Sequence, residues 1–208
     1  MPMTSIKKIA PADIEAESFR IITRELGETD FDNFEFPVVR RIIHATGDFD
    51  FARTVRFSPA ADQAGLRAIR QGKNILVDVN MAAAGISRGL LAKWGGRVIC
   101  RVADPETAEL AAERGLTRSE AAILRAKDED IGIVAVGNAP TALLKTMALI
   151  DAAELFPDLV IGVPVGFVNA AESKELLAAG NYPYITALGR KGGTPVAVAA
   201  VNALLRLA

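Results

Sequence analysis

The chain contains one histidine, His44, and histidine is the side chain best suited to proton transfer at neutral pH. Arg40 and Arg41 precede it by four and three residues, a spacing that places all three side chains on one face of a helix. Three potential cations repel one another unless an anion lies between them. The pattern therefore predicts that a substrate carboxylate pairs with the arginines while the imidazole acts as general acid. A histidine that ends a helix beside solvated arginines fits the same pattern.

Further polar side chains follow apolar segments that have the composition of strands. Asp78 and Asn80 follow one such segment, Asn138 lies in a loop after another, and Arg190 and Lys191 lie between glycines after a third. Glycine beside a strand end lets the backbone approach a ligand closely, and the helix that follows offers free amide groups to an anion. These loops predict a ligand rich in carboxylates or phosphates. Ordinary strand–helix turns are also rich in glycine, and Asp78 and Asn80 could instead cap the next turn.

Predicted helix starts supply two more unusual positions. Thr117 is followed three residues later by Glu120, which fits a capping box. Arg118 comes directly after this cap, where a positive charge is slightly unfavourable, so it either holds a carboxylate or simply lies at the surface. Ser18 falls within the apolar face of an earlier helix, where a hydrophobic residue is expected.

Several common catalytic and binding motifs do not occur in the sequence. The glycine patterns of dinucleotide-binding and P-loop proteins are absent, which argues against a nucleotide cofactor. Neither H-E-x-x-H nor paired C-x-x-C occurs, and the single cysteine, Cys100, is expected to be a small buried hydrophobic residue, so we expect no bound metal. The single histidine lies before most candidate serines in the chain, which argues against a hydrolase triad with the order Ser, Asp or Glu, His.

Charge and hydropathy restrict the partners and the location. The 24 lysines and arginines nearly balance the 25 aspartates and glutamates, so no net field attracts nucleic acid or an acidic membrane. No segment approaches the roughly 18 consecutive apolar residues of a membrane span, and residues 1–10 lack the apolar core of a signal peptide. We therefore expect a cytoplasmic protein. Hydrophobic residues make up 50% of the chain, which we attribute to buried strands and a subunit interface.

Capping residues, prolines and glycines divide the chain into alternating elements. Helices are predicted at about residues 11–26, 37–47, 58–72, 87–95 and 104–115, after Thr117, and at 195–207. Ser58 and Ser87 are predicted to cap two of them. Strands are predicted at 75–77, 98–102, 131–136, 159–163 and 184–188, with a possible further strand at 51–57.

Near-continuous apolar strands that alternate with helices are typical of a parallel sheet covered on both faces. We therefore predict a single domain over residues 1–208 with an α/β fold in three layers, α/β/α, around a mainly parallel sheet. Right-handed crossovers bring the carboxyl ends of the strands to one edge, where open α/β sheets bind their ligands. The candidate loops are expected to meet at that edge.

From about residue 11 to residue 207, the sequence resembles the precorrin-8X methylmutase family, which includes the cobalt-precorrin-8 methylmutases. The resemblance rests on several segments that occur in the same order. They are ESFRI (17–21), RIIHATGD (41–48), FSP (57–59), DVNM (78–81), TRS (117–119), GNAPTAL (137–143), GVPVGFV (162–168), AAESK (170–174) and GRKGG (189–193).

The resemblance implies a three-layer α/β/α fold, a homodimer with active sites near the subunit interface, and an isomerase of cobalamin (vitamin B12) biosynthesis. The implied reaction is a 1,5-sigmatropic shift of a methyl group from C-11 to C-12 on ring C. It converts precorrin-8X to hydrogenobyrinic acid, or cobalt-precorrin-8 to cobyrinic acid. Nothing is added to or removed from this tetrapyrrole, so no cofactor is expected.

The resemblance also implies roles for particular residues. The catalytic histidine of the family corresponds to His44, its substrate-contacting serine to Ser18, and its arginines to Arg41 and Arg118. With the loop residues included, the predicted substrate-binding set is Ser18, Arg41, Asp78, Asn80, Thr117, Arg118, Asn138 and Arg190.

Two positions depart from the family pattern, and two other functions remain open. Asn169 stands where glycine is expected before AAESK, and Ala16 stands where some relatives carry a larger residue, so fine substrate contacts do not transfer automatically. The alternatives are a nucleotide-dependent Rossmann-type transferase and a tetrapyrrole carrier that binds product without turnover. The sequence does not decide whether the substrate carries cobalt.

Overall fold

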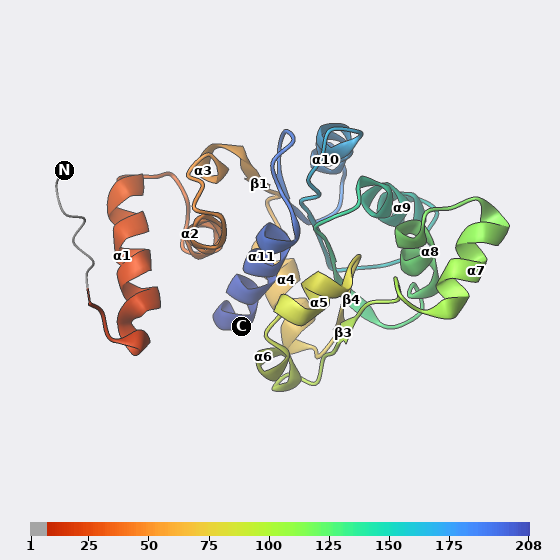
Figure 1. Ribbon diagram of the computed structural model, residues 1–208, viewed down its shortest axis with the longest axis horizontal. Coiled ribbons are helices and arrows are strands. Elements are labelled where there is room, and N and C mark those ends of the chain that lie inside the picture. Colours follow the sequence, from red (N-terminus) through yellow and green to blue (C-terminus); the bar gives the residue numbers. More distant parts are fainter. Residues whose placement is uncertain (1–7) are drawn as a thin grey trace.

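A six-stranded sheet forms the centre of the computed structural model, which describes residues 8–208 (Figure 1). In spatial order the strands are β1 (Val55–Phe57), β6 (Tyr184–Ala187), β5 (Leu159–Gly162), β4 (Ile131–Val136), β2 (Asn74–Val77) and β3 (Val98–Ile99). Every neighbouring pair is parallel except β1 and β6. The predicted mainly parallel sheet is confirmed. Residues 1–7 of the predicted domain lie outside the described residues.

Helices cover both faces of this sheet, which confirms the predicted three layers (Figure 1). One side carries α1 (Ile14–Leu26), α2 (Glu35–Thr46), α3 (Phe51–Thr54), α4 (Ala61–Arg70), α5 (Asn80–Gly85), α6 (Arg88–Ala92) and α11 (Thr194–Leu207), with the short 3-10 turn η1 (Pro11–Asp13) before α1. The other side carries α7 (Pro105–Arg114), α8 (Arg118–Arg125), α9 (Pro140–Asp151) and α10 (Ala170–Ala178).

Successive residues of the central strands pack into two separate cores. In β2, Ile75 and Val77 belong to the core that includes α2, α4 and α11, whereas Leu76 belongs to the core that includes α8 and α9. In β4, Ile133 and Val134 are divided in the same way. Because the side chains of a strand alternate between its faces, a strand that is apolar at every position needs cover on both sides.

The first strand and the helix after it differ from the prediction. Residues 51–54 form helix α3, and only Val55–Phe57 pairs with β6. Ser58 does not cap α4, which begins at Ala61. Its hydroxyl instead accepts a hydrogen bond from the backbone N–H of Tyr184 at 2.9 Å. The side chain is therefore engaged by the adjoining strand β6 rather than by the next helix.

The predictions for β3 and α6 also need correction. Strand β3 ends at Ile99 rather than at residue 102, because the chain then leaves the sheet toward α7. Ser87 occupies the N-cap position of α6, but its hydroxyl makes no capping hydrogen bond. Its backbone N–H donates to Oδ1 of Asn202 in α11 at 2.8 Å. The predicted side-chain cap is therefore absent, and Ser87 is instead held by a long-range contact of its backbone.

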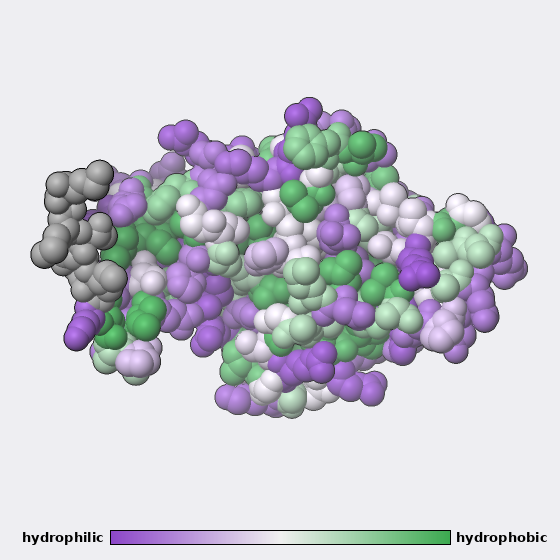
Figure 2. Space-filling model, in the orientation of Figure 1, coloured by the Kyte–Doolittle hydropathy of each residue, from purple (hydrophilic) through white to green (hydrophobic). Residues whose placement is uncertain are grey.

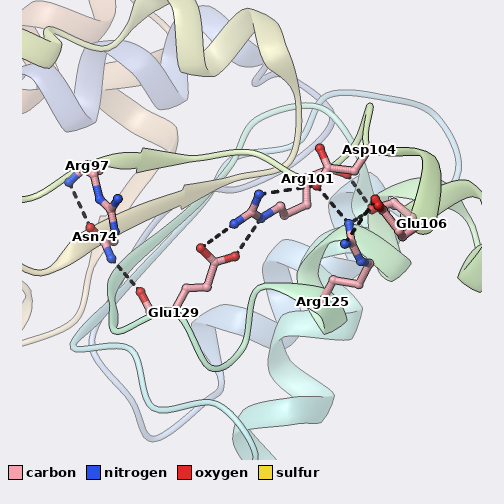
Figure 3. A network of polar contacts seen from close by, with 8 residues as sticks. Asn74, Arg97, Arg101, Asp104, Glu106, Arg125 and Glu129 are labelled. Carbon is pink, nitrogen blue, oxygen red and sulfur yellow. Dashed lines mark hydrogen bonds and ion pairs between the residues drawn. The ribbon is translucent and has the colours of Figure 1, made fainter.

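A polar network joins the segment after β3 to the helices on its side of the sheet (Figure 3). Arg101 donates through Nε and Nη2 to Glu129, at 2.7 Å in both cases. Arg125, in the last turn of α8, donates to Asp104 at 3.0 Å and to the hydroxyl of Thr107 at 2.8 Å. These contacts hold the C-terminal end of α8, whose first turn carries a predicted substrate-binding arginine.

The two terminal helices differ in how much of their surface is covered. Helix α11 is buried along most of its length, as predicted for 195–207. Helix α1 lies at one end of the molecule and packs mainly on α2 (Figure 1), so its predicted apolar face is only partly buried. Ile22 is in the core, whereas Ile14 is 51% exposed. Within residues 8–208, no helix is long and apolar enough to cross a membrane.

The loop after β6 packs backbone against backbone on the loop after β5. The N–H of Gly193 donates to the carbonyl of Val163 at 2.8 Å, and the N–H of Gly166 donates to the carbonyl of Arg190 at 3.2 Å. A Cβ atom on Gly192 would lie 2.3 Å from the carbonyl oxygen of Val163. Glycine at this position is therefore required by the close approach of the two loops.

We expect Gly192→Ala to lower the free energy of unfolding by about 1–3 kcal/mol, because the added Cβ would push two backbone segments apart. Gly89→Ala is the matched control, since Gly89 lies within α6 and an added Cβ would meet nothing within 4 Å. The control should gain roughly 0.5–1 kcal/mol from helix propensity. Urea unfolding measures both values, and equal stability of the two variants would contradict the tight loop contact.

Candidate functional site

Asp78, directly after β2, joins the carboxyl ends of β2 and β4. Its carboxylate is fully buried and accepts hydrogen bonds from the backbone N–H groups of Gly137 (3.0 Å), Asn138 (2.8 Å) and Ala139 (2.8 Å). Burial raises the pKa of the Asp78 carboxyl, although these three hydrogen bonds oppose the rise. Both oxygens accept these hydrogen bonds, so Asp78 holds the loop after β4. The substrate contact predicted for Asp78 stays a prediction.

The two loops that Asp78 joins present asparagine side chains to solvent. Asn80 opens α5 and Asn138 lies in the loop before α9, and both are exposed. Within residues 8–208, neither side-chain amide has a hydrogen-bond partner. An amide offers both donors and an acceptor. Both predicted binding residues are therefore free to meet a ligand, beside Met81, which is 68% exposed.

Thr117 joins the starts of α8 and α9. The predicted capping box is present, because the N–H of Glu120 donates to Thr117 Oγ1 (3.2 Å) and the N–H of Thr117 donates to Glu120 Oε2 (2.8 Å). Thr117 Oγ1 also lies 3.0 Å from Oγ1 of Thr141, in the first turn of α9. Arg118 is exposed at this junction and has no partner among the described residues. An anion would compensate a cation placed at a helix start.

The two cations of the loop after β6 have different surroundings. Lys191 donates through Nζ to Asp48 at 2.7 Å and to Asp50 at 2.6 Å, which ties the loop to the corner between α2 and α3. These bonds raise the pKa of Lys191 and lower the pKa of Asp48. The guanidinium carbon of Arg190 lies 5.4 Å from the centre of the exposed Phe167 ring. Since two carboxylates already balance Lys191, Arg190 is the cation of this pair that is available to a ligand.

A buried lysine supports the same loop. Lys174 is fully buried, and its Nζ donates to the carbonyl oxygen of Lys191 at 2.7 Å. Burial lowers the pKa of Lys174 to about 8. No role was predicted for this residue. The spacing of Ala170, Ser173, Lys174 and Leu177 marks the inward face of α10, and this pattern was the available signal that the lysine is buried.

His44 lies in the last turn of α2, where it is exposed and contacts Phe19 of α1. The two rings meet edge to face, with their centres 5.2 Å apart and their planes at 72°. The guanidinium carbons of Arg40 and Arg41 lie 4.5 Å and 5.0 Å from the centre of the Phe19 ring. The predicted grouping of one histidine with two arginines is therefore present, and Phe19, for which no role was predicted, is the contact that the three share.

The protein itself supplies an anion for one of these arginines. Nη1 of Arg41 lies 2.9 Å from Oε1 of Glu15 in α1, and this contact lowers the pKa of Glu15. Ser18, on the same helix, donates its hydroxyl to the carbonyl of Ile14 at 2.9 Å. The hydroxyl oxygen of Ser18 can still accept a hydrogen bond from a ligand. Arg41, by contrast, is already paired.

Most of the predicted residues fall into two groups. His44, Arg41 and Ser18 form the α1–α2 group, and the strand-end group consists of Asn80, Thr117, Arg118 and Asn138. The loop that carries Arg190 and Lys191 links the two groups. Lys191 binds Asp48 at the corner after α2, and the start of α11, which follows this loop, packs on the loop after β4. The contact of Lys191 with Asp48 and the packing of Gly137 on Thr194 thus connect elements that are far apart in the sequence.

At the carboxyl edge of the sheet, Arg118 and Arg190 are exposed, and so is His44 at the end of α2. Apolar side chains lie exposed on the same edge, among them Phe167 (84%) and Val168 (77%). Figure 2 shows hydrophobic, weakly polar and hydrophilic residues side by side across the middle of one face. Within residues 8–208, no cluster of three or more potential ligands could hold a metal ion.

Comparison with known proteins identifies close relatives of this chain. The family model described as precorrin-8X methylmutase matches residues 13–207. The cobalt-precorrin-8 methylmutase of Priestia megaterium is 46% identical over 201 residues, which cover 96% of this chain and 89% of that protein. The precorrin-8X methylmutase of Pseudomonas aeruginosa is 46% identical over 167 residues, or 79% of this chain and 80% of that protein. The crystal structure of precorrin-8X methylmutase from Thermus thermophilus superposes with a TM-score of 0.86 at 45% identity, over 94% of this chain and 96% of that one.

The buried lysine gives a prediction for stability against pH. Because its folded-state pKa is about 8 rather than 10.5, the unfolded chain binds the proton more strongly between these values. The free energy of unfolding should therefore rise through this pH window, by as much as about 3 kcal/mol. Lys174→Met removes the titrating group, so the wild type should gain stability relative to this variant as pH rises from 8 to 10.5.

Urea unfolding at several pH values measures this difference, and Lys93→Met, at an exposed lysine of the surface, is the control that should follow the wild type. A constant difference between the wild type and Lys174→Met over the whole window would contradict the assignment.

Proposed function

We propose that this chain, which belongs to the precorrin-8X methylmutase family, moves a methyl group from C-11 to C-12 of ring C with His44 as general acid. Its family makes it an intramolecular methyl-transferring isomerase of cobalamin biosynthesis. The bond from the methyl group to C-11 breaks, the bond to C-12 forms, and the composition of the substrate stays the same. The single observation that supports the acid is the position of His44, exposed at the end of α2 beside two guanidinium groups.

A methyl shift of this kind needs an acid more than it needs a cofactor. Protonation of the pyrrolic system makes ring C more electron-poor, which lowers the barrier to migration. A positioned general acid contributes about 10²- to 10⁴-fold to the rate. The edge-to-face contact with Phe19 restricts the orientations of the His44 imidazole. The imidazole is nevertheless exposed and therefore open to the substrate. Because nothing is gained or lost overall, the reaction calls for neither a methyl donor nor a hydride carrier.

The acetate and propionate arms of the macrocycle require polar anchors. Arg118, Arg190, Asn80 and Asn138 are exposed, and none of them is paired with a carboxylate within residues 8–208. Charged hydrogen bonds from an arginine to a carboxylate are among the stronger contacts available to a protein. We assign these side chains to the arms, and Asp78 and Thr117 to holding the loops that carry them. A chain of nearly zero net charge can bind a polyanion in this way.

A second copy of the chain is proposed to complete the cleft. A macrocycle bound to the open edge of one protomer would leave much of its apolar area in water, whereas ligand sites bury most of the ligand. Exposed apolar residues of the same edge, such as Met81, Phe167 and Val168, provide surface that another protomer could cover. These features support the homodimer predicted from the sequence.

Relatives at 46% identity are named for cobalt-precorrin-8 and for precorrin-8X, so both compounds are proposed substrates. The products are then cobyrinic acid and hydrogenobyrinic acid. The cytoplasmic location stays a prediction from the sequence.

Incubation of the protein with each substrate tests the reaction directly. A change in the visible spectrum at constant mass is the expected result. A gain in mass would indicate a transferase instead, and binding without spectral conversion would indicate a carrier.

We expect His44→Ala to reduce turnover by about 10²- to 10⁴-fold while the fold is retained, because the exposed imidazole is removed without opening the core. Stopped-flow absorbance under saturating substrate gives the rate. The affinity of the variant for the corrin product is the control, and it should stay close to that of the wild type. Turnover near the wild-type value would reject the role of His44 as acid.

Arg118→Gln is expected to raise KM about tenfold and to leave kcat nearly unchanged, because it removes a charged anchor remote from the proton transfer. Arg114→Gln is the matched control, since Arg114 is an exposed arginine in the last turn of the neighbouring helix α7. Steady-state kinetics of both variants distinguish the two positions. Equal KM values for Arg118→Gln and the control would refute the anchor.

A further inference from the structure

The guanidinium group of Arg40 lies between two aromatic rings. Its central carbon is 4.5 Å from the centre of the Phe19 ring on α1 and 5.4 Å from the centre of the Phe36 ring, one turn earlier on α2. Within residues 8–208, it forms no ion pair, and its Nε is buried without a hydrogen-bond partner. The neighbouring Arg41 differs, because Glu15 lies 2.9 Å from it.

Such an arginine is incompletely satisfied in the protein without substrate. A buried donor without an acceptor destabilises the folded state, and burial together with the charge of Arg41 lowers the pKa of Arg40. Stacking against two rings offsets part of this and fixes the plane of the guanidinium. Nε is the buried nitrogen without a partner, so the two terminal nitrogens, which also lack partners, reach solvent. They remain available for a bidentate contact with a carboxylate.

We propose that Arg40 binds a carboxylate arm of the corrin substrate and that Phe19 is a positioning residue, which holds the Arg40 guanidinium and the His44 ring in one arrangement. This inference rests on the proposed function and makes it more specific, since of the two arginines predicted to pair with a substrate carboxylate it assigns that role to Arg40 and not to Arg41. Arg41, neutralised by Glu15, then serves to fix α1 on α2. Anchor and acid come from positions four residues apart on one helix face.

Substitution by methionine separates binding from structural support. Arg40→Met places an apolar chain of similar length between the two rings and removes the unpartnered Nε. The melting temperature should therefore equal or exceed that of the wild type, while KM rises about tenfold or more. Arg24→Met, at an exposed arginine in the last turn of α1, is the control and should change neither value. A lower melting temperature with unchanged KM would overturn the proposal, and Arg40→Gln gives the same KM test if the methionine variant folds poorly.

The neighbouring ion pair supplies a second comparison. Arg41→Met and Glu15→Gln each remove one side of the same contact, so both should lower the melting temperature to a similar extent. Their KM values should rise less than that of Arg40→Met. A larger rise in KM for Arg41→Met than for Arg40→Met would return the anchoring role to Arg41 and overturn the assignment.

Phe19 can be tested without substrate, because the chain has one histidine and so one set of imidazole proton signals in an NMR spectrum. The ring of Phe19, 5.2 Å away, shifts these signals. Phe19→Leu should move them toward the values of an unstructured histidine and lower kcat, whereas Phe19→Tyr should preserve both. Unchanged signals and unchanged kcat in Phe19→Leu would refute the positioning role. A wild-type protein that converts no corrin would instead refute the proposed function.

Discussion

Three backbone hydrogen bonds to one buried carboxylate shape the edge on which the candidate site lies. Asp78 accepts them from residues 137–139, so the ends of β2 and β4 are held together. The arrangement beyond this point follows from that constraint: Asn138 is turned to solvent, α9 begins at once, and its first turn meets Thr117 at the start of α8. A carboxylate without water is stable only when its oxygens are hydrogen-bonded. Here the backbone provides those bonds, and the side-chain amides of Asn80 and Asn138 on the two joined loops stay free among the described residues.

A buried cation has the complementary role on the β6 side of the same edge. Lys174 donates a hydrogen bond to a backbone carbonyl of the glycine loop, and that loop contacts the corner after α2 through Lys191. Two buried ionisable groups thus hold backbone segments instead of pairing with each other. Methionine would fill the space of Lys174 at a lower cost in desolvation, so the lysine is explained by the position that it imposes on the loop. The buried lysine thus lowers the free energy of unfolding but fixes the position of the loop.

The sequence predicted the elements better than their contacts. The limits of β4 agree with the prediction because its apolar run is buried on both faces, and the capping box at Thr117 is a local pattern that needs no knowledge of tertiary structure. Ser58 was assigned to a cap since its partner in β6 is 126 residues away. The pairing of Arg41 with a glutamate 26 residues earlier, which leaves Arg40 as the unpaired cation, was equally invisible to helix periodicity. Contacts of this kind depend on which helices meet, and hydrophobic spacing identifies the buried face but not its neighbour.

Helix α1 rests mainly on α2 and lies apart from the sheet (Figure 1). Its separation from α2 would break the Glu15–Arg41 ion pair and remove the ring beside His44, yet the six strands would keep their pairing. Local openings of this kind require less free energy than global unfolding. Amide hydrogens of α1 are therefore expected to exchange with solvent sooner than those of the central strands, and the same opening would free the His44 imidazole from its contact with Phe19.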